Sequence, residues 1–585
     1  MGAVRIIAAI LLASAAAPSL AHGLELQILH TNDHHSHLDG ASQDITLAGT
    51  TYRVEMGGFS RLAGLIEGLR TDNSLVLNSG ELNGTLYFSL FRGEPDFKLF
   101  NALGIDAYQI GNHEFDEGED VLAGLIKMAE FPVLGANIHP TEASPLHGLD
   151  IRPYIVKEIE GEKVAVLGVL KVEKTVNSSM VTDAVQFSEE TETVRRTIAE
   201  LEGQGIDKIV VLSHLGYEGD IALAGEVSGI DIIIGGDTHN LLDSTGELAE
   251  MGLPVSGEYP TVVDSPEGTP VYIAQAWEMA HGLGVMNVTF DDAGKVTAAS
   301  GNILLPVDRP FQVLGADEKF ADLDAAGETA LLTAIENAQT LVLQQPDPQV
   351  AEILVPYSKE LESFRAQDLG TVAQTMPFER IPTAFAPGAA PTGSYAAHVV
   401  ADSFLAYLPH ADIAIQNAGG VRTEFLSGTF TVADAYTMLP FSNTVATLTM
   451  TGAQVVAALE DAADYALNSG STGAFPYASH LRFDANLGAA KGSRILAVEV
   501  KDRQSGQWAP IDMAASYRVV TNSFTALGKD GYDTFATVIA TDPAAHEDSS
   551  VAYAVPLVEY FREHLQDGAL PPLNSDDYSL KSVTE

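Results

Sequence analysis

The chain has 585 residues, of which 46% are hydrophobic and 19% charged, so it can bury several cores and is not an intrinsically disordered protein. Its 31 lysines and arginines are outnumbered by 79 aspartates and glutamates, which gives a formal net charge of −48. A surface this acidic argues against a nucleic-acid polymer or an anionic membrane as partner, but it permits a small anion held by local cations. The sequence contains no cysteine, which excludes disulfides, a cysteine nucleophile, cysteine-ligated zinc and iron–sulfur clusters.

The N-terminus has the pattern of a secretory signal peptide. Arg5 precedes an Ala-rich apolar run at 6–17, and small residues at 19–21 predict cleavage after Ala21. The run is too short to span a bilayer comfortably, and no later stretch approaches about 20 uninterrupted apolar residues. We therefore expect residues 1–21 to be a signal peptide, the mature protein to be secreted or periplasmic, and no part of it to insert into a membrane.

The first 300 residues alternate short apolar strands with amphipathic helices, which is the pattern of a layered α/β domain, and we place this domain at 22–345. Helical spacing of apolar residues predicts helices over 58–69, 119–128 and 190–201. The strand candidates are 24–29, 75–77, 107–110, 164–169, 208–212 and 231–234.

The section 308–369 is rich in Ala, Glu, Leu and Gln and is expected to contain no strand. Helical spacing over 349–365 predicts a helix that connects two domains, and we place this linker at 346–369. A second α/β domain is expected at 370–585, with a frayed acidic tail at 574–585. Its predicted helices are 393–408 and 454–468, and its predicted strands are 413–416 and 517–521.

Five of the predicted N-terminal strands end in side chains that can bind metals. In an open α/β sheet, ligands bind outside the carboxyl ends of the strands, so these side chains are expected to converge. Each motif alone is a weak signal, because a lone histidine after a strand is more often structural. Histidine, carboxylate and amide ligands together suit a pair of divalent ions, which clamp a phosphoryl group and its attacking water. The segments that follow the five strands are 30–37, 78–84, 111–116, 213–216 and 235–240.

These segments resemble the calcineurin-like metallophosphoesterases and, more narrowly, the secreted 5′-nucleotidase/UDP-sugar hydrolase family. The resemblance covers nearly the whole mature chain. It implies an N-terminal four-layer metallophosphoesterase β-sandwich flanked by helices, a helical linker and a second α/β domain that binds the substrate. The motifs that carry it are 33–35 (DHH), 80–81 (GE), 111–114 (GNHE), 213–214 (SH) and 236–239 (GDTH), with typical phrases at 84–90, 111–116 and 131–137.

The resemblance also implies two divalent metal ions. Asp33 and His35 fall on ligand positions of one ion, and Asn112 and His214 fall on ligand positions of the other. Glu81 occupies the position of the bridging carboxylate, which is normally Asp in the family. Because Glu is one methylene longer, we expect it to bridge with altered spacing or to bind one ion.

The remaining positions of the predicted centre depart further from the family. Asp237 falls where the family usually has a histidine ligand, and His239 occupies the last ligand position. Since Glu81 and Asp237 both harden the site, we expect Mn to be favoured, with Zn, Co or Mg as alternatives. The resemblance makes His113 the catalytic histidine, and Asp116 is expected to orient its imidazole and favour its protonated form.

The second domain carries a candidate nucleotide site. Gly419 and Gly420 allow the backbone to approach a ligand closely, and the planar guanidinium of Arg422 can clamp an anion. Phe441 and Phe524 lie in predicted loops, where aromatic rings can stack on a flat base. The resemblance implies that these two rings sandwich the nucleoside and that Arg422 binds phosphate.

Polar contacts complete this prediction. Asn443 and Asp530 match the family's base and ribose contacts, and Asn417 precedes the two glycines. Relatives carry further arginines before an ETNLGN-like helix start, whereas 391–398 contains none and His398 replaces the family asparagine. We therefore expect phosphate recognition to be weaker or built differently.

The main hypothesis is a secreted dinuclear-metal phosphohydrolase acting on nucleoside 5′-monophosphates, with UDP-sugars as a further substrate class. Its expected partner is a small-molecule nucleotide, and the sequence specifies no oligomeric state. The alternatives are a 2′,3′-cyclic nucleotide phosphodiesterase/3′-nucleotidase, a hydrolase of thiosulfate oxidation, and a nucleotide-binding protein with an impaired centre. Glu81 and Asp237 favour the last alternative, whereas Phe441 and Phe524 argue against a thiosulfate substrate.

Overall fold

The computed structural model describes residues 23–83, 85–179, 181–315, 319–441, 443–468 and 472–584. The predicted signal peptide at 1–21 lies outside these residues. In the described part of the chain, no helix combines the length and the apolar character needed to cross a bilayer.

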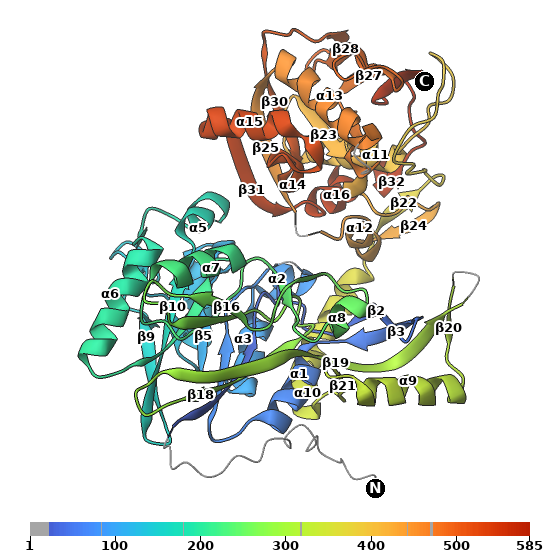
Figure 1. Ribbon diagram of the computed structural model, residues 1–585. Helices are drawn as coiled ribbons and strands as arrows, with labels where there is room; N and C mark the ends of the chain where they lie inside the picture. The colour runs from blue at the N-terminus through green and yellow to red at the C-terminus, as the bar shows by residue number, and fades with distance from the viewer. Residues whose placement is uncertain are drawn as a thin grey trace.

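Two large sheets form the centre of the N-terminal part of the chain (Figure 1). The first has the order β2-β3-β19-β18-β1-β4-β5-β6-β8, with β20 and β21 also paired to β19, and the second has the order β16-β17-β13-β12-β10-β9. The strands of the first sheet are β1 (Glu25–Thr31), β2 (Ala41–Leu47), β3 (Thr50–Met56), β4 (Ser74–Asn78), β5 (Ala107–Gln109), β6 (Val133–Leu134), β8 (Ile151–Arg152), β18 (Leu283–Phe290), β19 (Val296–Leu314), β20 (Phe320–Asp322) and β21 (Leu341–Leu343). The strands of the second are β9 (Tyr154–Ile159), β10 (Glu162–Leu170), β12 (Lys208–His214), β13 (Ile232–Ile234), β16 (Thr261–Asp264) and β17 (Pro270–Ala274).

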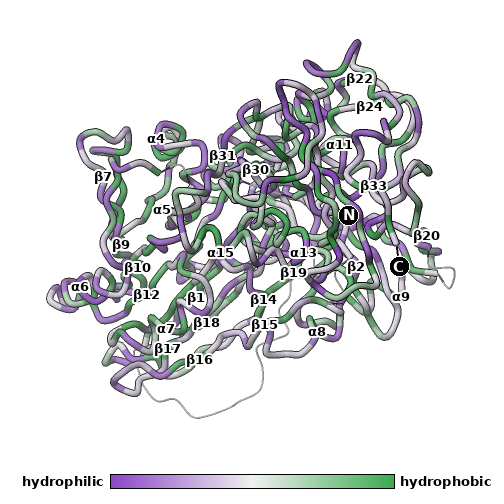
Figure 2. Tube along the Cα trace, turned by 90° about the horizontal axis from the view of Figure 1, so that it is seen from above, coloured by the Kyte–Doolittle hydropathy of each residue, from purple (hydrophilic) through white to green (hydrophobic). Residues whose placement is uncertain are grey.

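Alternation along the strands divides the core into layers. In β4, Leu75 and Leu77 belong to the apolar cluster between the two sheets, whereas Val76 belongs to the cluster under the helices, because successive side chains of a strand point to opposite faces. Every residue of β12 is buried, as expected for a parallel strand covered on both faces. Figure 2 shows hydrophobic residues along such central strands and hydrophilic residues on outer helices such as α6 (Glu190–Gly203).

Helices cover the outer faces of both sheets. Their contacts give the sequence helices, sheet, sheet, helices, which confirms the predicted α/β class and its layered N-terminal sandwich. The predicted helices agree with α1, α4 and α6 to within two residues at each end. The first sheet is covered by α1 (Phe59–Leu69), α3 (Glu94–Leu103) and α4 (Glu119–Met128), and the second by α6 and α7 (Tyr217–Glu226); α2 (Leu86–Phe91), α5 (Val172–Ser178), α8 (Glu247–Glu250) and α9 (Ala325–Asn337) complete this part.

The expectation that 308–369 contains no strand is wrong. Strand β19 runs on to Leu314, and both β20 and β21 lie in this section. The outer half of β19 has no continuous apolar run, since Phe311 is buried but the residues on either side of it are half-buried or exposed and Leu314 is 37% exposed. Its partners in this section, β20 and β21, have three residues each, which is too short for length or alternation to predict a strand.

Helix α10 (Pro348–Arg365) lies where the linker helix was predicted. Asp347 caps it by accepting hydrogen bonds from the backbone of Gln349 and Val350, and Pro348 occupies the first turn, where its missing N–H is not needed. The buried face of α10 belongs to the same apolar cluster as α1 and α3. This face consists of Val350, Leu354, Tyr357 and Leu361.

The chain passes from one buried unit to the other once. The N-terminal clusters end with Leu361, and the C-terminal cluster begins with Leu369, so the crossing lies just after α10. Phe364 and Tyr436 pack against both units, and α10 contacts α12 (Val432–Met438) across the boundary. The domain limits 22–345, 346–369 and 370–585 stay a prediction.

The C-terminal part is a second α/β unit, drawn in orange and red in Figure 1. Its five-stranded sheet has the order β26-β23-β30-β25-β31, its four-stranded sheet the order β29-β28-β27-β33, and its three-stranded sheet the order β24-β22-β32. The strands are β22 (Asp368–Val372), β23 (Ile413–Asn417), β24 (Gly428–Thr431), β25 (Thr444–Thr451), β26 (Pro476–Ser479), β27 (Leu481–Asn486), β28 (Ile495–Lys501), β29 (Trp508–Pro510), β30 (Ser516–Asn522), β31 (His546–Ala552), β32 (Ala569–Leu570) and β33 (Leu580–Thr584). The helices are α11 (Tyr395–Tyr407), α12, α13 (Gly452–Asn468), α14 (Ser523–Ala526), α15 (Asp533–Thr541) and α16 (Val555–Glu559).

The expectation of a frayed tail at 574–585 is also wrong. Strand β33 pairs in parallel with β27, and the buried Tyr578 ring contacts His398 and Tyr477. Leu580 and Val583 are buried in the C-terminal core. Because the tail is acidic in composition, the sequence did not indicate that Tyr578, Leu580 and Val583 would be buried.

Candidate functional site

Side chains from three loops of the N-terminal unit converge at one edge of its sheets. Asp33, His35, Glu81 and His239 each offer one ligand atom, and these atoms lie within 4.8 Å of one another. The loops follow β1, β4 and β13, and both β1–β4 and β12–β13 are parallel pairs, so the carboxyl ends of the paired strands share an edge. The predicted convergence therefore occurs for these four residues.

Glu81 lies between two histidines. Its Oε1 is 3.2 Å from Nε2 of His214, and its Oε2 is 3.6 Å from Nε2 of His35. Its side chain is 1% exposed, and Oε1 also accepts a hydrogen bond of 3.0 Å from the backbone N–H of His113. Burial would raise the pKa of Glu81, but the charges of His113, His214 and His35 hold it well below its usual value, so the group is a carboxylate.

Asn112 is fully buried beside this carboxylate, directly before His113. Among the described residues, neither its Oδ1 nor its Nδ2 has a hydrogen-bond partner. A buried unpaired polar group costs about 1–3 kcal/mol, so a residue in this state is expected to have a further ligand. An amide oxygen together with imidazoles and carboxylates, and without sulfur, fits a divalent cation.

Second partners hold two of the imidazoles in defined orientations. His214 donates from Nδ1 to the carbonyl oxygen of Ser79 at 2.6 Å, which leaves Nε2 directed at Glu81. His239 Nδ1 lies 2.8 Å from Oε2 of Glu278, which leaves its Nε2 only 2.8 Å from Nε2 of His35. Two imidazole nitrogens that converge in this way share a proton or a cation, and outer partners of this kind are typical of metal-binding histidines.

The backbone of these loops adopts conformations that non-glycine residues rarely take. Four of the predicted ligand positions have φ in the left-handed region, where L-residues pay a steric cost. Strained backbone of this kind clusters at functional sites, because the surrounding structure must hold it in place. The values are 46° for Asp33, 46° for His35, 79° for Asp237 and 57° for His239.

His113 and Asp116 form a pair at the rim of the cluster. His113 Nδ1 lies 2.6 Å from Oδ2 of Asp116, and that oxygen also accepts from the side chain of Asn83. Burial lowers the pKa of His113, but the Glu81 and Asp116 carboxylates outweigh it and raise the pKa to about 9. The imidazole is 31% exposed, so its free Nε2 can reach a molecule in solvent.

Asp237 is not one of the four clustered ligands, although its backbone N–H donates to Oδ1 of Asp33 at 2.9 Å. It forms an ion pair with Lys174, and its Oδ1 is 3.9 Å from Nε2 of His214. The sequence analysis missed Lys174 and Glu278, although the rule that found the other residues also applies to them. Lys174 follows the apolar strand β10 and Glu278 follows β17, so both lie after the carboxyl end of a strand.

The predicted substrate residues of the C-terminal unit gather at one edge of its five-stranded sheet. β23 and β30 are parallel, so the loop that begins at Asn417 and the helix α14 that carries Phe524 follow neighbouring carboxyl ends. β25 is antiparallel to β30, with Val445 opposite Asn522, so Phe441 and the half-buried Asn443 lie just before β25 at the same edge.

Two aromatic rings are exposed at this edge. Phe441 is 45% exposed and Phe524 is 39% exposed, although large apolar side chains are usually covered. The Arg422 guanidinium carbon lies 5.5 Å from the centre of the Phe441 ring, within the range of a cation–π contact. Asn417 donates from Nδ2 to Oδ2 of Asp530 at 2.9 Å, which ties the two polar residues together.

The two adjacent glycines allow close packing inside the protein, and their approach to a ligand stays a prediction. A Cβ at Gly419 would lie 2.9 Å from Cα of Gly473, and one at Gly420 would lie 2.2 Å from Nε2 of Gln416. Side chains at these positions would therefore collide with the protein itself. His398, which occupies the family's asparagine position, is 3% exposed and donates to the carbonyl oxygen of Ala478 at 2.8 Å.

Two packed sheets with histidines and carboxylates at their carboxyl ends, joined to a separate α/β unit, define a metal-dependent phosphoester hydrolase. The family model for calcineurin-like phosphoesterases matches residues 26–241. The model for the 5′-nucleotidase C-terminal domain matches residues 386–537.

The chain is 40% identical over 561 residues to a probable 5′-nucleotidase of Treponema pallidum, covering 93% of each chain. It is 37% identical over 558 residues to the NAD 5′-nucleotidase of Haemophilus influenzae, covering 94% of this chain and 92% of that one. The solved structure of the Haemophilus influenzae NAD nucleotidase gives a TM-score of 0.73 at 36% identity, covering 96% of this chain and all of that chain. The chain therefore belongs to the 5′-nucleotidase family, as its motifs predicted.

Proposed function

We propose that this protein releases phosphate from nucleoside 5′-monophosphates at a centre of two divalent metal ions. The observation that carries the proposal is the position of Glu81, whose two carboxylate oxygens are directed to different histidines, His35 and His214. A carboxylate placed in this way can join two ions despite its extra methylene, as two-metal sites require. The proposed ligands are Asp33, His35, Glu81, Asn112, His214, Asp237 and His239.

The proposed native metal is Mn, with Zn, Co and Mg as alternatives. Asp33, Glu81 and Asp237 supply oxygen from carboxylates and Asn112 supplies it from an amide, a donor set harder than one built mainly from imidazoles. When bound, the ions would polarise the phosphoryl group and acidify a water molecule. Asp237 is paired with Lys174 and would have to release this ammonium in order to bind an ion.

The chain's own residues would move the proton. During hydrolysis water adds to phosphorus, the bond from phosphorus to the nucleoside oxygen breaks, and the nucleoside leaves as an alcohol after gaining a proton. His113 is suited to supply positive charge and that proton from Nε2, because Asp116 holds its Nδ1 at 2.6 Å. General acid catalysis of this kind contributes about 10²–10⁴-fold.

The C-terminal edge would hold the nucleoside. Phe441 and Phe524 would stack on the base, and Arg422 would contact the phosphate. Asn443 and Asp530 would contact base and ribose, with Asn417 fixing Asp530 through its 2.9 Å hydrogen bond. Gly419 and Gly420 would shape the loop that carries Arg422.

Nucleotides with a pyrophosphate bond are a second proposed substrate class. The likeness to the NAD 5′-nucleotidase extends over 94% of this chain at 37% identity, which favours NAD alongside the UDP-sugars predicted from the sequence. We further propose that the protein acts outside the cytoplasm, in the periplasm or beyond, on the basis of the signal-peptide pattern at 1–21.

The test is phosphate release by protein purified without chelator, with Mn, Zn, Co or Mg added in turn. The substrates are AMP, UMP, NAD, UDP-glucose, 2′,3′-cyclic AMP and p-nitrophenyl phosphate. Fast metal-dependent release from AMP and UMP is expected, with Mn most effective. Release from the cyclic substrate alone, or none from any nucleotide while two ions are bound, would overturn the proposal.

A matched pair of variants tests the role of the histidine. His113→Ala should lower kcat at least about 100-fold while nucleotide still binds. His139→Ala is the control, because His139 is an exposed histidine whose ring, among the described residues, is hydrogen-bonded only to Ser188, at 2.6 Å. An unchanged rate in His113→Ala would show that the catalytic assignment is wrong.

A further inference from the structure

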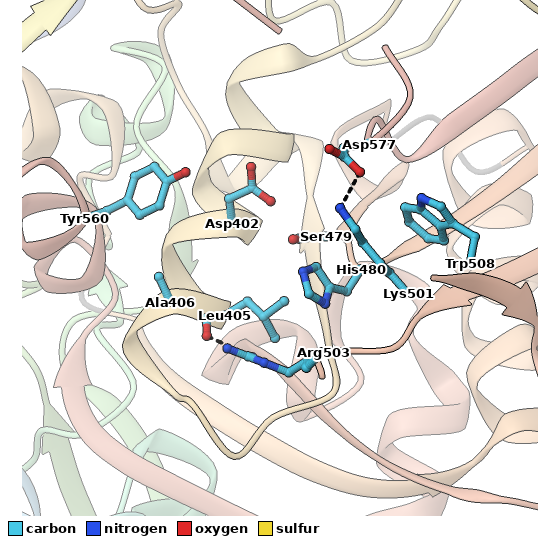
Figure 3. Close-up of a pocket in the computed structure, with 10 residues that line it drawn as sticks. All are labelled: Asp402, Leu405, Ala406, Ser479, His480, Lys501, Arg503, Trp508, Tyr560 and Asp577. Atoms are coloured by element: carbon cyan, nitrogen blue, oxygen red, sulfur yellow. Dashed lines mark hydrogen bonds and ion pairs between the residues drawn. The ribbon is translucent and has the colours of Figure 1, made fainter. Parts of the chain in front are cut away.

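A cavity of about 300 Å³ lies in the C-terminal unit, away from the proposed substrate loops (Figure 3). In the β23–β26 pair, Asn417 lies opposite Pro476 and Ala414 lies opposite Ser479. The substrate loop follows the Asn417 end, whereas the cavity is lined by Ser479 and His480 at the other end. The cavity and the substrate loops are therefore at opposite edges of the sheet.

The cavity contains an arginine without a carboxylate partner. Arg503 donates from Nη1 to the carbonyl oxygens of Leu405 and Ala411, at 3.1 and 2.8 Å, and these bonds fix the guanidinium in place. Within the described part of the chain, no carboxylate lies within ion-pair distance of it. In a chain with 79 acidic and 31 basic residues, such an arginine beside a cavity is an available anion-binding group.

Of the two carboxylates that line the cavity, Asp577 already has two hydrogen-bond partners. Asp577 accepts from Lys501 at 2.5 Å through Oδ1 and from Asn574 at 2.8 Å through Oδ2. Asp402 lies 3.6 Å from Nε2 of His398. The Lys501 ammonium has three N–H groups, so it retains donors for a ligand after pairing with Asp577.

His480 has two features of a functional position. Its φ is 56°, in the left-handed region that a histidine rarely adopts. Its Nδ1 is buried and has no hydrogen-bond partner among the described residues. Burial and the nearby charges of Arg503 and Lys501 lower the pKa of His480, so the ring is neutral and can offer an N–H donor.

Aromatic side chains form the walls of the cavity. Figure 3 shows Tyr560 on one side and Trp508 on the other, with His480 between them. Lys501 is paired with Trp508 across β28 and β29, and its Nζ lies 5.7 Å from the indole ring. Tyr560 begins a π-helix, Tyr560–His564, and π-helical turns are frequent at functional sites. The walls favour an organic ligand over a bare ion.

We propose that this cavity binds a small organic anion, whose carboxylate or phosphate group is held by Arg503 and Lys501 and whose body lies between Trp508 and Tyr560. His480 and Ser479 supply further hydrogen bonds to the same group. The cavity volume accommodates a ligand larger than an isolated phosphate ion. This site is distinct from the proposed metal centre and from the nucleotide loops.

Tryptophan fluorescence tests the proposal in solution. The chain has two tryptophans, Trp277 and Trp508, and Trp508 lines the cavity. Titration of the metal-loaded full chain with succinate and, separately, with glycerol 2-phosphate should change the tryptophan emission. The probe that gives the larger change identifies whether the cavity prefers a carboxylate or a phosphate group. The change should disappear in Trp508→Phe, whereas a signal from the metal centre would persist through Trp277.

Variants of the cations complete the test. Arg503→Gln and Lys501→Gln should each raise the apparent Kd at least about tenfold, and Arg518→Gln, an exposed arginine paired with Glu547, should not change it. Crystals soaked with each probe should show it between Arg503 and Lys501. If Arg503→Gln fails to fold, Lys501→Gln alone decides. No Trp508-dependent signal for either probe, or equal affinity in Lys501→Gln and Arg518→Gln, would overturn the proposal.

Discussion

Removal of the Phe441 ring should lower kcat/KM for nucleotides, and the size of the loss follows from the exposed area of the ring. Phe441 is 45% exposed. A phenylalanine side chain can bury about 150–250 Å², so a stacked base would cover about 90 Å² of this ring. At about 25 cal/mol per Å² this contact contributes about 2 kcal/mol, which corresponds to about 30-fold in kcat/KM. The value lies within the range of about 1–3 kcal/mol measured for base stacking.

The assay compares two substrates that differ by the base. Phe441→Ala should lower kcat/KM for AMP about 30-fold and leave kcat/KM for ribose 5-phosphate within about twofold, because only AMP has a base to stack. Met513→Ala is the matched control, since Met513 is also an exposed apolar side chain, at 53%, and lies in a distant turn. An equal loss for both substrates would show that the ring acts through the fold, and no loss for AMP would refute the stacking role.

Three further predictions concern the metal centre and the buried carboxylates. Glu81→Gln should reduce bound metal from about two ions per chain to about one, as measured by elemental analysis. It should also lower the rate of phosphate release by about 100-fold or more. Two retained ions would contradict the bridging position of Glu81. Lys174→Gln should tighten metal binding about fivefold, as measured by competition with a chelator. The ion pair between Lys174 and Asp237 is partly exposed and contributes about 1 kcal/mol, and in the variant it would no longer compete with the metal for Asp237. Weaker metal binding in the variant would argue against Asp237 as a ligand. Burial raises the pKa of Asp231 to about 7, so the folded state retains a proton that the unfolded state loses, and stability should fall as pH rises from about 4 to 7. Asp231→Asn should lose less stability over that window in urea unfolding, and parallel curves for the two proteins would exclude this cause.

Much of the N-terminal site was predictable because each strand there is a short apolar run followed at once by polar residues. This signal pointed to Asp33, His35, Glu81 and His239, and the parallel pairing of the strands explains why they meet. The same signal follows β10, but the Lys174 ammonium offers only donors and no acceptor to a metal, so metal-ligand chemistry does not single it out.

Other features had no signal in the local sequence. The outer half of β19 buries Phe311 alone, and its partners β20 and β21 have three residues each, so neither a buried run nor alternation marked them as strands. The sequence predicted that another group approaches the backbone closely at the glycines 419 and 420. It could not identify that group, because Gly473 and Gln416 meet these glycines only in the folded chain. The cavity beside Arg503 joins residues from α11, β26, β28 and the π-helix, which no short motif connects.

The single passage of the chain between the two buried units has a mechanical consequence. Two or more connecting segments define a rotation axis, whereas one segment defines a point about which a body can turn in any direction. Because α10 packs on the N-terminal unit, that point lies between its end at Arg365 and Leu369. The orientation of the unit that carries Phe441 and Phe524 is thus determined by surface contacts, such as that between α10 and α12, and by the ligand it holds. A change in the length or stiffness of residues 366–368 would alter how often the two halves of the proposed site meet, without changing any residue that contacts the substrate.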